Sequence, residues 1–316
     1  MKTIFDQELD RISLCMVQNF GHYDPSYFAE KLIGRVGKII ENRHDVQLCF
    51  AIKVALEEGV PYSVIRIGDG EANILTYGNY PETPEYNFFA VKRIVAMQKD
   101  NFVVNKFWAL TLKEYLMSAI AQADIIGVTG LDRRGALTSM QRANGAAQGI
   151  NKDPRGIVGH WRAVDVVLRL AEQGMFFNKT LAPAHLYFSV IENIKILMGA
   201  AQEVFIISNR ISVFNKLSSI FNKKFTFIEV GEPVDSVRIY PRFIEEVYDA
   251  LPDNMSGCLC LIGAGPWAEI YCSFVKQKGG VAVDVGSGLD LLDGEKTRPI
   301  HKQYQIENLL VHHRSV

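Results

Sequence analysis

The sequence lacks three features that would assign it to a broad class at once: a long hydrophobic run, an excess of one charge, and cysteines in metal-binding spacing. No apolar run approaches the roughly 18–20 residues that cross a bilayer, and the N-terminus has no secretory apolar region. Its 34 basic and 35 acidic residues give a formal net charge of −1, which argues against a broad electrostatic grip on nucleic acid. We therefore expect a soluble, cytoplasmic protein with no membrane span and no nucleic-acid partner.

The five cysteines give no sign of a zinc site or of a disulfide framework. Cys258 and Cys260 stand two residues apart in an apolar run, so a strand would place them on one face. No second pair offers zinc-ligand spacing, and the number is odd, which disfavours a disulfide framework. We expect buried, reduced thiols.

What the sequence does contain is a large apolar fraction in a regular rhythm. Of 316 residues, 48% are hydrophobic, enough for a substantial core. Continuous apolar runs, typical of strands buried on both faces, alternate with helical patterns. The expected strands are 63–67, 124–130, 204–208, 225–230, 258–262 and 281–285, and the expected helices include 161–170, 211–221, 243–251 and 267–275.

This alternation predicts an α/β fold with a Rossmann-like, mostly parallel sheet and helices on both faces. The first 60 residues are expected to be helical, because Phe28, Leu32, Val36 and Ile39 recur at helical spacing. We expect three parts: a helical segment over 1–60 packed on the main domain, an α/β main domain over 61–298, and a tail over 299–316.

The most informative stretch is Ser63-Val-Ile-Arg-Ile-Gly-Asp-Gly-Glu71, a β-branched run that stops at glycines and acids. Asp69 and Glu71 are two residues apart, and such oxygen ligands suit a hard divalent ion. Gly68 and Gly70 remove side chains that would keep a phosphate away. The alternative is structural: Asp69 N-caps a helix, Gly68 completes a tight turn, and Arg66 forms a salt bridge within the sheet.

Arg66-Ile-Gly-Asp-Gly-Glu71 resembles the signature of the GT-D-type glycosyltransferases, whose Asp-x-Glu (DXE) element is associated with metal and sugar-nucleotide binding. A glycine turn at Leu261–Pro266, followed by a helix and the strand Gly280–Gly286, is also similar to that family. The resemblance implies a manganese- or magnesium-dependent transferase of the hexosyltransferase type. Its donor would be a nucleotide sugar, expected to be a UDP-sugar, and its acceptor a glycan, glycolipid or glycoprotein. A homo-oligomer is possible.

In parallel sheets, ligands bind beyond the carboxyl ends of the strands, so we expect the site along one rim. Asp69 and Glu71 would hold the metal, and Arg66, Gly68 and Gly70 would lie near the phosphates. Asp290 is a candidate for the general base or for holding a sugar hydroxyl. Further donor-binding candidates at strand ends are Ser208, Asn209, Arg210, Gly263, Gly265, Pro266 and Asp284. For these the alternatives are a helix cap at Ser208–Arg210 and a tight turn at Gly263–Pro266.

A rival reading comes from the same C-terminal region. Gly263-x-Gly265-x-x-Ala268, with Asp284 ending the next strand, fits a dinucleotide fingerprint. It predicts an NAD-dependent oxidoreductase or an S-adenosylmethionine-dependent methyltransferase. Pro266 is unusual inside that fingerprint, and the reading leaves Gly68–Glu71 unexplained. A third possibility is a binding or scaffolding protein that retains the fold without turnover.

Overall fold

The computed structural model describes residues 25–77, 106–131, 154–231 and 242–303, together with Gln7 and Arg11. The chain forms two compact units: unit 1 comprises Met1–Asn42 and Arg66–Ala184, and unit 2 comprises Arg43–Ile65 and His185–Val316. The chain passes from unit 2 into unit 1 within strand β2 (Tyr62–Ile67). The division into 1–60, 61–298 and 299–316 stays a prediction.

Unit 1 contains a parallel set of strands in the order β1-β4-β3. They are β1 (Lys38–Ile39), β3 (Ile125–Val128) and β4 (Thr180–Pro183). Its helices are α2 (Pro25–Leu32), α4 (Asp69–Leu75), α6 (Lys106–Gln122) and α8 (Pro154–Glu172). The end of β2 also belongs here, where the Ile67 carbonyl accepts a 3.4 Å hydrogen bond from Thr129 Oγ1.

Strand β1 replaces part of a helix that the sequence predicted. The helix expected to continue past Leu32 through Val36 and Ile39 is absent, because α2 ends at Leu32 and Lys38–Ile39 form β1 instead. Gly37 makes this possible: an added Cβ there would lie 3.0 Å from the Lys179 carbonyl oxygen. Glycine thus lets β1 approach the backbone that leads into β4.

Unit 2 contains the longer parallel set, in the order β2-β8-β7-β5-β6. Its other strands are β5 (Glu203–Ser208), β6 (Lys224–Glu229), β7 (Cys258–Gly263) and β8 (Val281–Asp284), as the apolar runs predicted. The helices are α3 (Val46–Glu58), α9 (Tyr187–Glu192), α10 (Ile194–Ala200), α11 (Ile211–Ile220), α13 (Arg242–Ala250), α14 (Ala268–Gln277) and α15 (Gly288–Asp293).

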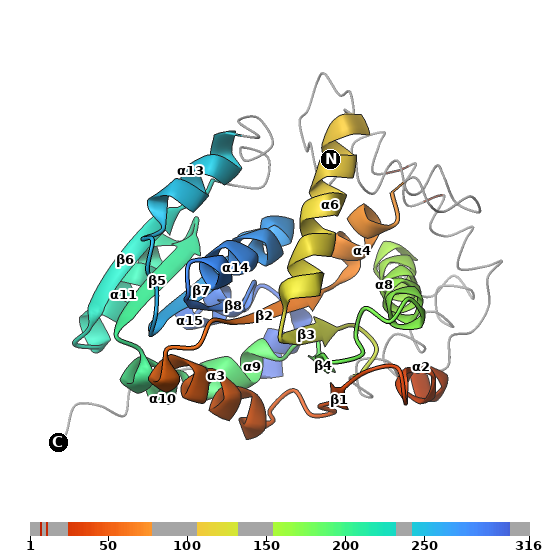
Figure 1. The fold of residues 1–316 in the computed structure, drawn as a ribbon, viewed down its shortest axis with the longest axis horizontal. Coiled ribbons are helices and arrows are strands. Elements are labelled where there is room, and N and C mark those ends of the chain that lie inside the picture. Colours follow the sequence, from red (N-terminus) through yellow and green to blue (C-terminus); the bar gives the residue numbers. More distant parts are fainter. Residues whose placement is uncertain are drawn as a thin grey trace. The chain divides into compact units, whose positions relative to one another are not determined.

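The connections in unit 2 run in two directions from the centre of the strand order. α11 leads from β5 to the outer strand β6, whereas α14 leads from β7 to β8 on the other side. Right-handed crossovers of opposite direction place their helices on opposite faces. Consistently, α14 packs on α13, whereas α11 packs on α15 (Figure 1). This confirms the predicted α/β fold and puts a topological switch point between β5 and β7, where such sheets bind ligands.

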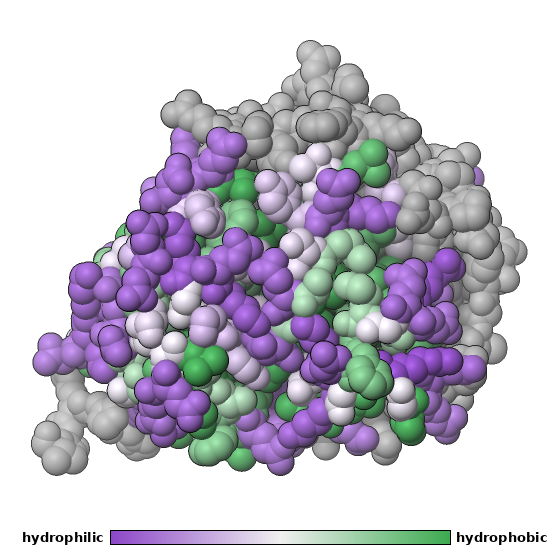
Figure 2. All heavy atoms as spheres, viewed as in Figure 1, coloured by the Kyte–Doolittle hydropathy of each residue, from purple (hydrophilic) through white to green (hydrophobic). Residues whose placement is uncertain are grey.

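Helix α11 is amphipathic. Val213 and Leu217 are fully buried, whereas Ile211 at the start of the helix is 49% exposed. The buried pair is spaced i, i+4, so it lies along one stripe of the helix. Figure 2 shows a mostly hydrophilic surface over α11 and α13.

The described residues bear on two expectations from composition. Cys49, Cys258, Cys260 and Cys272 are buried and none of the four is in a disulfide, which confirms the expected reduced thiols in this part of the chain. Burial raises the pKa of the Cys49 thiol to about 11, so it is protonated at neutral pH. Among the described helices, none has both the length and the apolarity to span a membrane.

Gly130 offers a test of packing in unit 1. Its φ is +103°, and an added Cβ would lie 2.9 Å from both Phe28 Cε1 and Val164 Cγ2. We expect Gly130→Ala to lower the free energy of unfolding by about 2–3 kcal/mol, from backbone strain and overpacking together. Chemical denaturation measures the change.

The matched control is Gly34→Ala. Gly34 has a similarly positive φ, +76°, but no atom lies within 4 Å of its added Cβ. It should therefore show only the strain component, about 1 kcal/mol. Equal losses in the two variants would contradict the packing role of Gly130.

Candidate functional site

The turn from β2 into α4 positions the predicted acidic pair. Gly68 is the N-cap, with φ −97° and ψ −162°, and α4 begins at Asp69. The Glu71 carboxylate reaches back, so that its Oε2 accepts a 2.8 Å hydrogen bond from the Gly68 amide. This is one half of a capping box. The alternative in which Asp69 caps the helix is therefore wrong: Gly68 is the cap, and Glu71 supplies the capping carboxylate.

Asp69 is the available acid of the pair. Its side chain is exposed, and within the described ranges no hydrogen bond or ion pair engages it. At the next residue, an added Cβ on Gly70 would meet no atom within 4 Å, so space is open at Gly70. Gly68 serves the turn instead, because its added Cβ would lie 3.0 Å from Glu71 Oε2. The geometry thus gives the two carboxylates different roles.

The donor set at this turn fits a divalent cation only if other oxygens join it. Asp69 offers a free carboxylate, whereas one oxygen of Glu71 is engaged by Gly68. The described residues contain no group of three or more His, Cys, Asp or Glu arranged to hold a metal ion. Mg²⁺ typically uses one or two protein carboxylates and completes its octahedron with waters and substrate phosphates. Asp69 matches that mode of binding, and Arg66, which is half-buried, stays a predicted phosphate contact.

Helix α8 lies against α4 and contributes residues that the sequence did not single out. Arg162 is 3% exposed and donates to Thr76 Oγ1 at the C-cap of α4, where a cation complements the helix dipole. Burial lowers the pKa of His160 to about 4, so its imidazole is neutral at pH 7. Gly159 contacts Asp69 directly. The spacing around Trp161 predicts the helix, but nothing local reveals its partner.

Unit 2 gathers the remaining predicted residues at the carboxyl edge of its own strands. Ser208 at the end of β5 is paired with Gly263 at the end of β7, and Ile262 with Asp284 at the end of β8. These positions flank the switch point between β5 and β7. Ser208 is buried and its Oγ accepts a 3.2 Å hydrogen bond from the Arg210 amide. Arg210 is the N-cap of α11 and no side chain caps that helix, so this bond belongs to the turn and the capping alternative is not supported.

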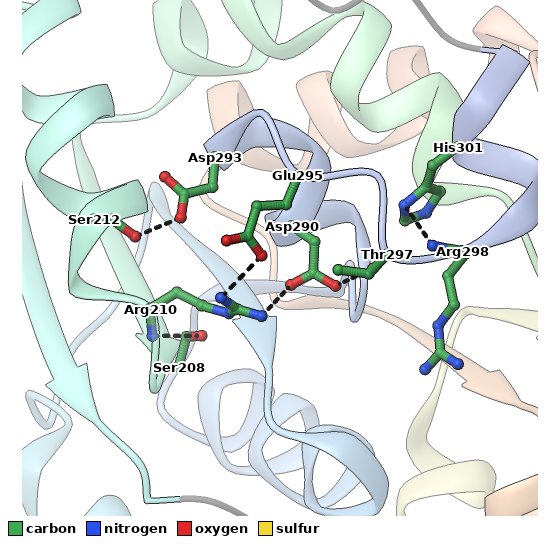
Figure 3. Close-up of polar contacts among 9 residues, drawn as sticks. All are labelled: Ser208, Arg210, Ser212, Asp290, Asp293, Glu295, Thr297, Arg298 and His301. Atoms are coloured by element: carbon green, nitrogen blue, oxygen red, sulfur yellow. Dashed lines mark hydrogen bonds and ion pairs between the residues drawn. The ribbon is translucent and has the colours of Figure 1, made fainter.

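Arg210 is held by two carboxylates, as Figure 3 shows. Its Nη2 lies 3.0 Å from Asp290 Oδ1, and its Nη1 lies 3.2 Å from Glu295 Oε2. Asp290 Oδ2 accepts a 2.5 Å hydrogen bond from Thr297. Nearby, Ser212 donates to Asp293 at 2.6 Å. Residues 290–297 are thus fastened to the start of α11, and both oxygens of the candidate base Asp290 are engaged.

The glycine turn after β7 has a packing explanation. An added Cβ at Gly263 would lie 2.6 Å from Leu289 Cδ1, because α15 packs on this point. Gly265 has a φ of +57°, and Pro266 follows it in the short 3₁₀ helix η1 (Gly265–Trp267) that precedes α14. Asp284 is 1% exposed. The strand-turn-helix-strand order of the dinucleotide reading is present, but its glycines serve α15 and the turn.

One donor-binding candidate remains, Asn209. Asn209 is exposed beside Arg210, and whether it contacts a donor stays a prediction.

The Arg210 cluster makes a quantitative prediction. Asp290 is 15% exposed and Glu295 is 52% exposed, so solvent screens the second ion pair more strongly. In double-mutant cycles of Arg210→Met with Asp290→Asn or Glu295→Gln, we expect a coupling of about 1 kcal/mol for Asp290 and at most about 0.5 kcal/mol for Glu295. Urea denaturation at low salt measures both. Equal couplings would contradict the burial argument.

Comparison with known proteins gives one family. Residues 44–152 match the model of the GT-D fold-like domain. No curated protein and no solved structure showed a significant match to the chain. The matched range includes the end of β2, the turn at Gly68–Glu71, and α4. The match spans about a third of the chain, and within that range the chain is similar to the GT-D fold-like domain.

Proposed function

We propose that the protein is a metal-dependent glycosyltransferase that moves a sugar from a nucleotide donor to a hydroxyl group of an acceptor. A UDP-sugar is the first candidate donor, and a glycan, glycolipid or glycoprotein is the acceptor. The observation that carries the proposal is Asp69: an exposed carboxylate without a protein partner in the described ranges, at the end of β2, within the GT-D-like range.

The chain's own residues divide the work at this turn. Glu71 holds the Gly68 amide and thereby fixes the start of α4. Asp69 follows directly and projects from the first position of the helix, with open space at Gly70. When bound there, Mn²⁺ or Mg²⁺ would neutralise the negative charge that develops on the leaving diphosphate. Asp69 would hold the ion, and Glu71 would contribute directly or through a water molecule.

The residues of unit 2 support a more limited part of the proposal. Ser208 and Gly263 end paired strands at a switch point, which is where open α/β sheets bind nucleotides. Arg210, however, contacts two carboxylates, so a phosphate would have to compete with Asp290 and Glu295 for its guanidinium. The identity of the general base stays a prediction, with Asp290 as its candidate.

A donor screen tests the function directly. Purified protein is incubated with UDP-, GDP- and CMP-sugars, with Mn²⁺ or with a chelator, and both donor hydrolysis and thermal stabilisation are recorded. We expect one nucleotide class to stabilise the protein and to be slowly hydrolysed, in a manner that depends on the metal. Stabilisation by NADH or S-adenosylmethionine without metal would instead favour the dinucleotide reading. Nucleotide binding with neither hydrolysis nor transfer would favour the scaffolding protein.

The acidic pair gives a sharper prediction, because the two carboxylates have different surroundings. Asp69→Asn removes the charge that would hold the ion, and we expect metal-dependent donor hydrolysis to fall at least about 100-fold, a loss of about 2.7 kcal/mol in transition-state stabilisation. The melting temperature should be nearly unchanged, because the exposed Asp69 makes no hydrogen bond within the described ranges. Hydrolysis rates measured against Mn²⁺ concentration show the effect.

Glu71→Gln is the matched comparison. Glutamine at the third helical position also completes a capping box, so the fold should be retained. If Glu71 contributes to the ion, activity falls and more Mn²⁺ is needed for half-maximal rate. Unchanged activity would confine Glu71 to capping, and full activity in Asp69→Asn would overturn the proposed metal site.

A further inference from the structure

A close contact in unit 1 joins helix α8 to the proposed metal ligand. An added Cβ at Gly159 would lie 2.8 Å from Asp69 Cβ, 3.3 Å from Asp69 Oδ2 and 3.5 Å from Asp69 Cγ. The first distance is shorter than any real contact between two such carbons, since protein interiors are already close-packed. The Asp69 side chain therefore rests on the α8 backbone, in the space that a side chain at position 159 would fill.

The backbone of α8 does not itself require glycine at this position. Gly159 lies in the interior of a helix of 19 residues, and its φ is not in the left-handed region. An alanine would favour the helix, because glycine loses more conformational freedom there. Conformational freedom therefore gives no reason for glycine here, whereas the contact with Asp69 gives one.

A second contact fixes how the two helices meet. Arg162, three residues after Gly159, donates to Thr76 Oγ1, and Thr76 lies seven residues after Asp69. Both spacings return to the same helix face. Asn73, one turn after Asp69 on that face, is 6% exposed. The contact between Gly159 and Asp69 thus lies at one end of the interface between α4 and α8. The hydrogen bond from Arg162 to Thr76 lies at the other end and holds the two helices together.

We propose that Gly159 is a positioning residue for the metal ligand: its missing side chain leaves the place in which the Asp69 carboxylate lies. This inference rests on the proposed function, because it takes Asp69 as the ligand. A methyl group at position 159 would push the Asp69 side chain from its place, because the atoms nearest to it belong to the Cβ and carboxylate of Asp69 rather than to the end of a long flexible chain. The cation would then lose a ligand held in the required position.

The test is Gly159→Ala, with Mn²⁺ affinity as the main measurement. In the presence of the donor identified by the screen, we expect the Mn²⁺ concentration for half-maximal hydrolysis to rise at least about 10-fold, equivalent to about 1.4 kcal/mol. The rate at saturating Mn²⁺ should change less. The matched control is Gly199→Ala in helix α10 of unit 2, where an added Cβ meets no atom within 4 Å. It should leave the metal dependence unchanged.

A stability cycle separates displacement of Asp69 from general disruption of the helix pair. Replacing Asp69 with glycine removes the Cβ that an alanine at 159 would meet at 2.8 Å. Any loss of stability caused by Gly159→Ala should therefore disappear in the Asp69→Gly background, and the helix-favouring effect of alanine should remain. An equal loss of stability in both backgrounds would show that alanine disturbs the interface between α4 and α8 elsewhere, and would overturn the positioning role.

The outcomes distinguish the two proposals. Wild-type protein without metal-dependent donor turnover would overturn the proposed function, and with it the role of Gly159. Wild-type turnover with an unchanged Mn²⁺ requirement in Gly159→Ala would overturn only the role of Gly159. A raised Mn²⁺ requirement, together with a stability loss that depends on the Asp69 Cβ, supports both.

Discussion

The hydrogen bond from the Gly68 amide to Glu71 determines what the acidic pair is free to do. It ties the third residue of α4 to the residue before the helix and so sets where the helix begins. With Glu71 turned back, Asp69 is left as the exposed carboxylate, lying beside Gly159 of α8. Two acids that look equivalent in the sequence thus have different surroundings: one oxygen of Glu71 is engaged by the Gly68 amide, whereas Asp69 has no hydrogen bond within the described residues.

At the ends of the strands of unit 2, candidate binding residues likewise have structural roles. Parallel pairing brings Ser208, Gly263 and Asp284 to one edge, as the sheet rule requires. Each of these positions also has a structural role or a buried setting: Ser208 accepts from the Arg210 amide, Gly263 makes room for Leu289, and Asp284 is buried. A position at the binding edge of a fold is therefore weak evidence for a binding role, until its side chain is shown to be free.

The sequence predicted the fold where burial leaves a continuous apolar signal, and failed where it does not. β5, β7 and β8 were placed within a residue or two, because both faces of each strand are covered and nearly every residue is apolar. β1 has two residues and β4 ends in Pro183, so neither carries such a pattern. In the site, the position of Asp69 at a strand-to-helix turn was predictable, whereas its contact with Gly159 was not, because helix packing joins residues that no local motif relates.

A site with one free carboxylate would bind the metal ion and the donor cooperatively. A hard cation in water keeps a full shell of oxygens, and a single protein ligand replaces too few of them to hold it tightly. A diphosphate that brings its own oxygens supplies the missing ligands, so that each partner raises the affinity of the other, as thermodynamic linkage requires. On the proposed function, Asp69 would therefore recognise the metal and the donor as one unit, and the exactness with which Gly159 and the capped turn place that carboxylate would matter more than the number of acids nearby.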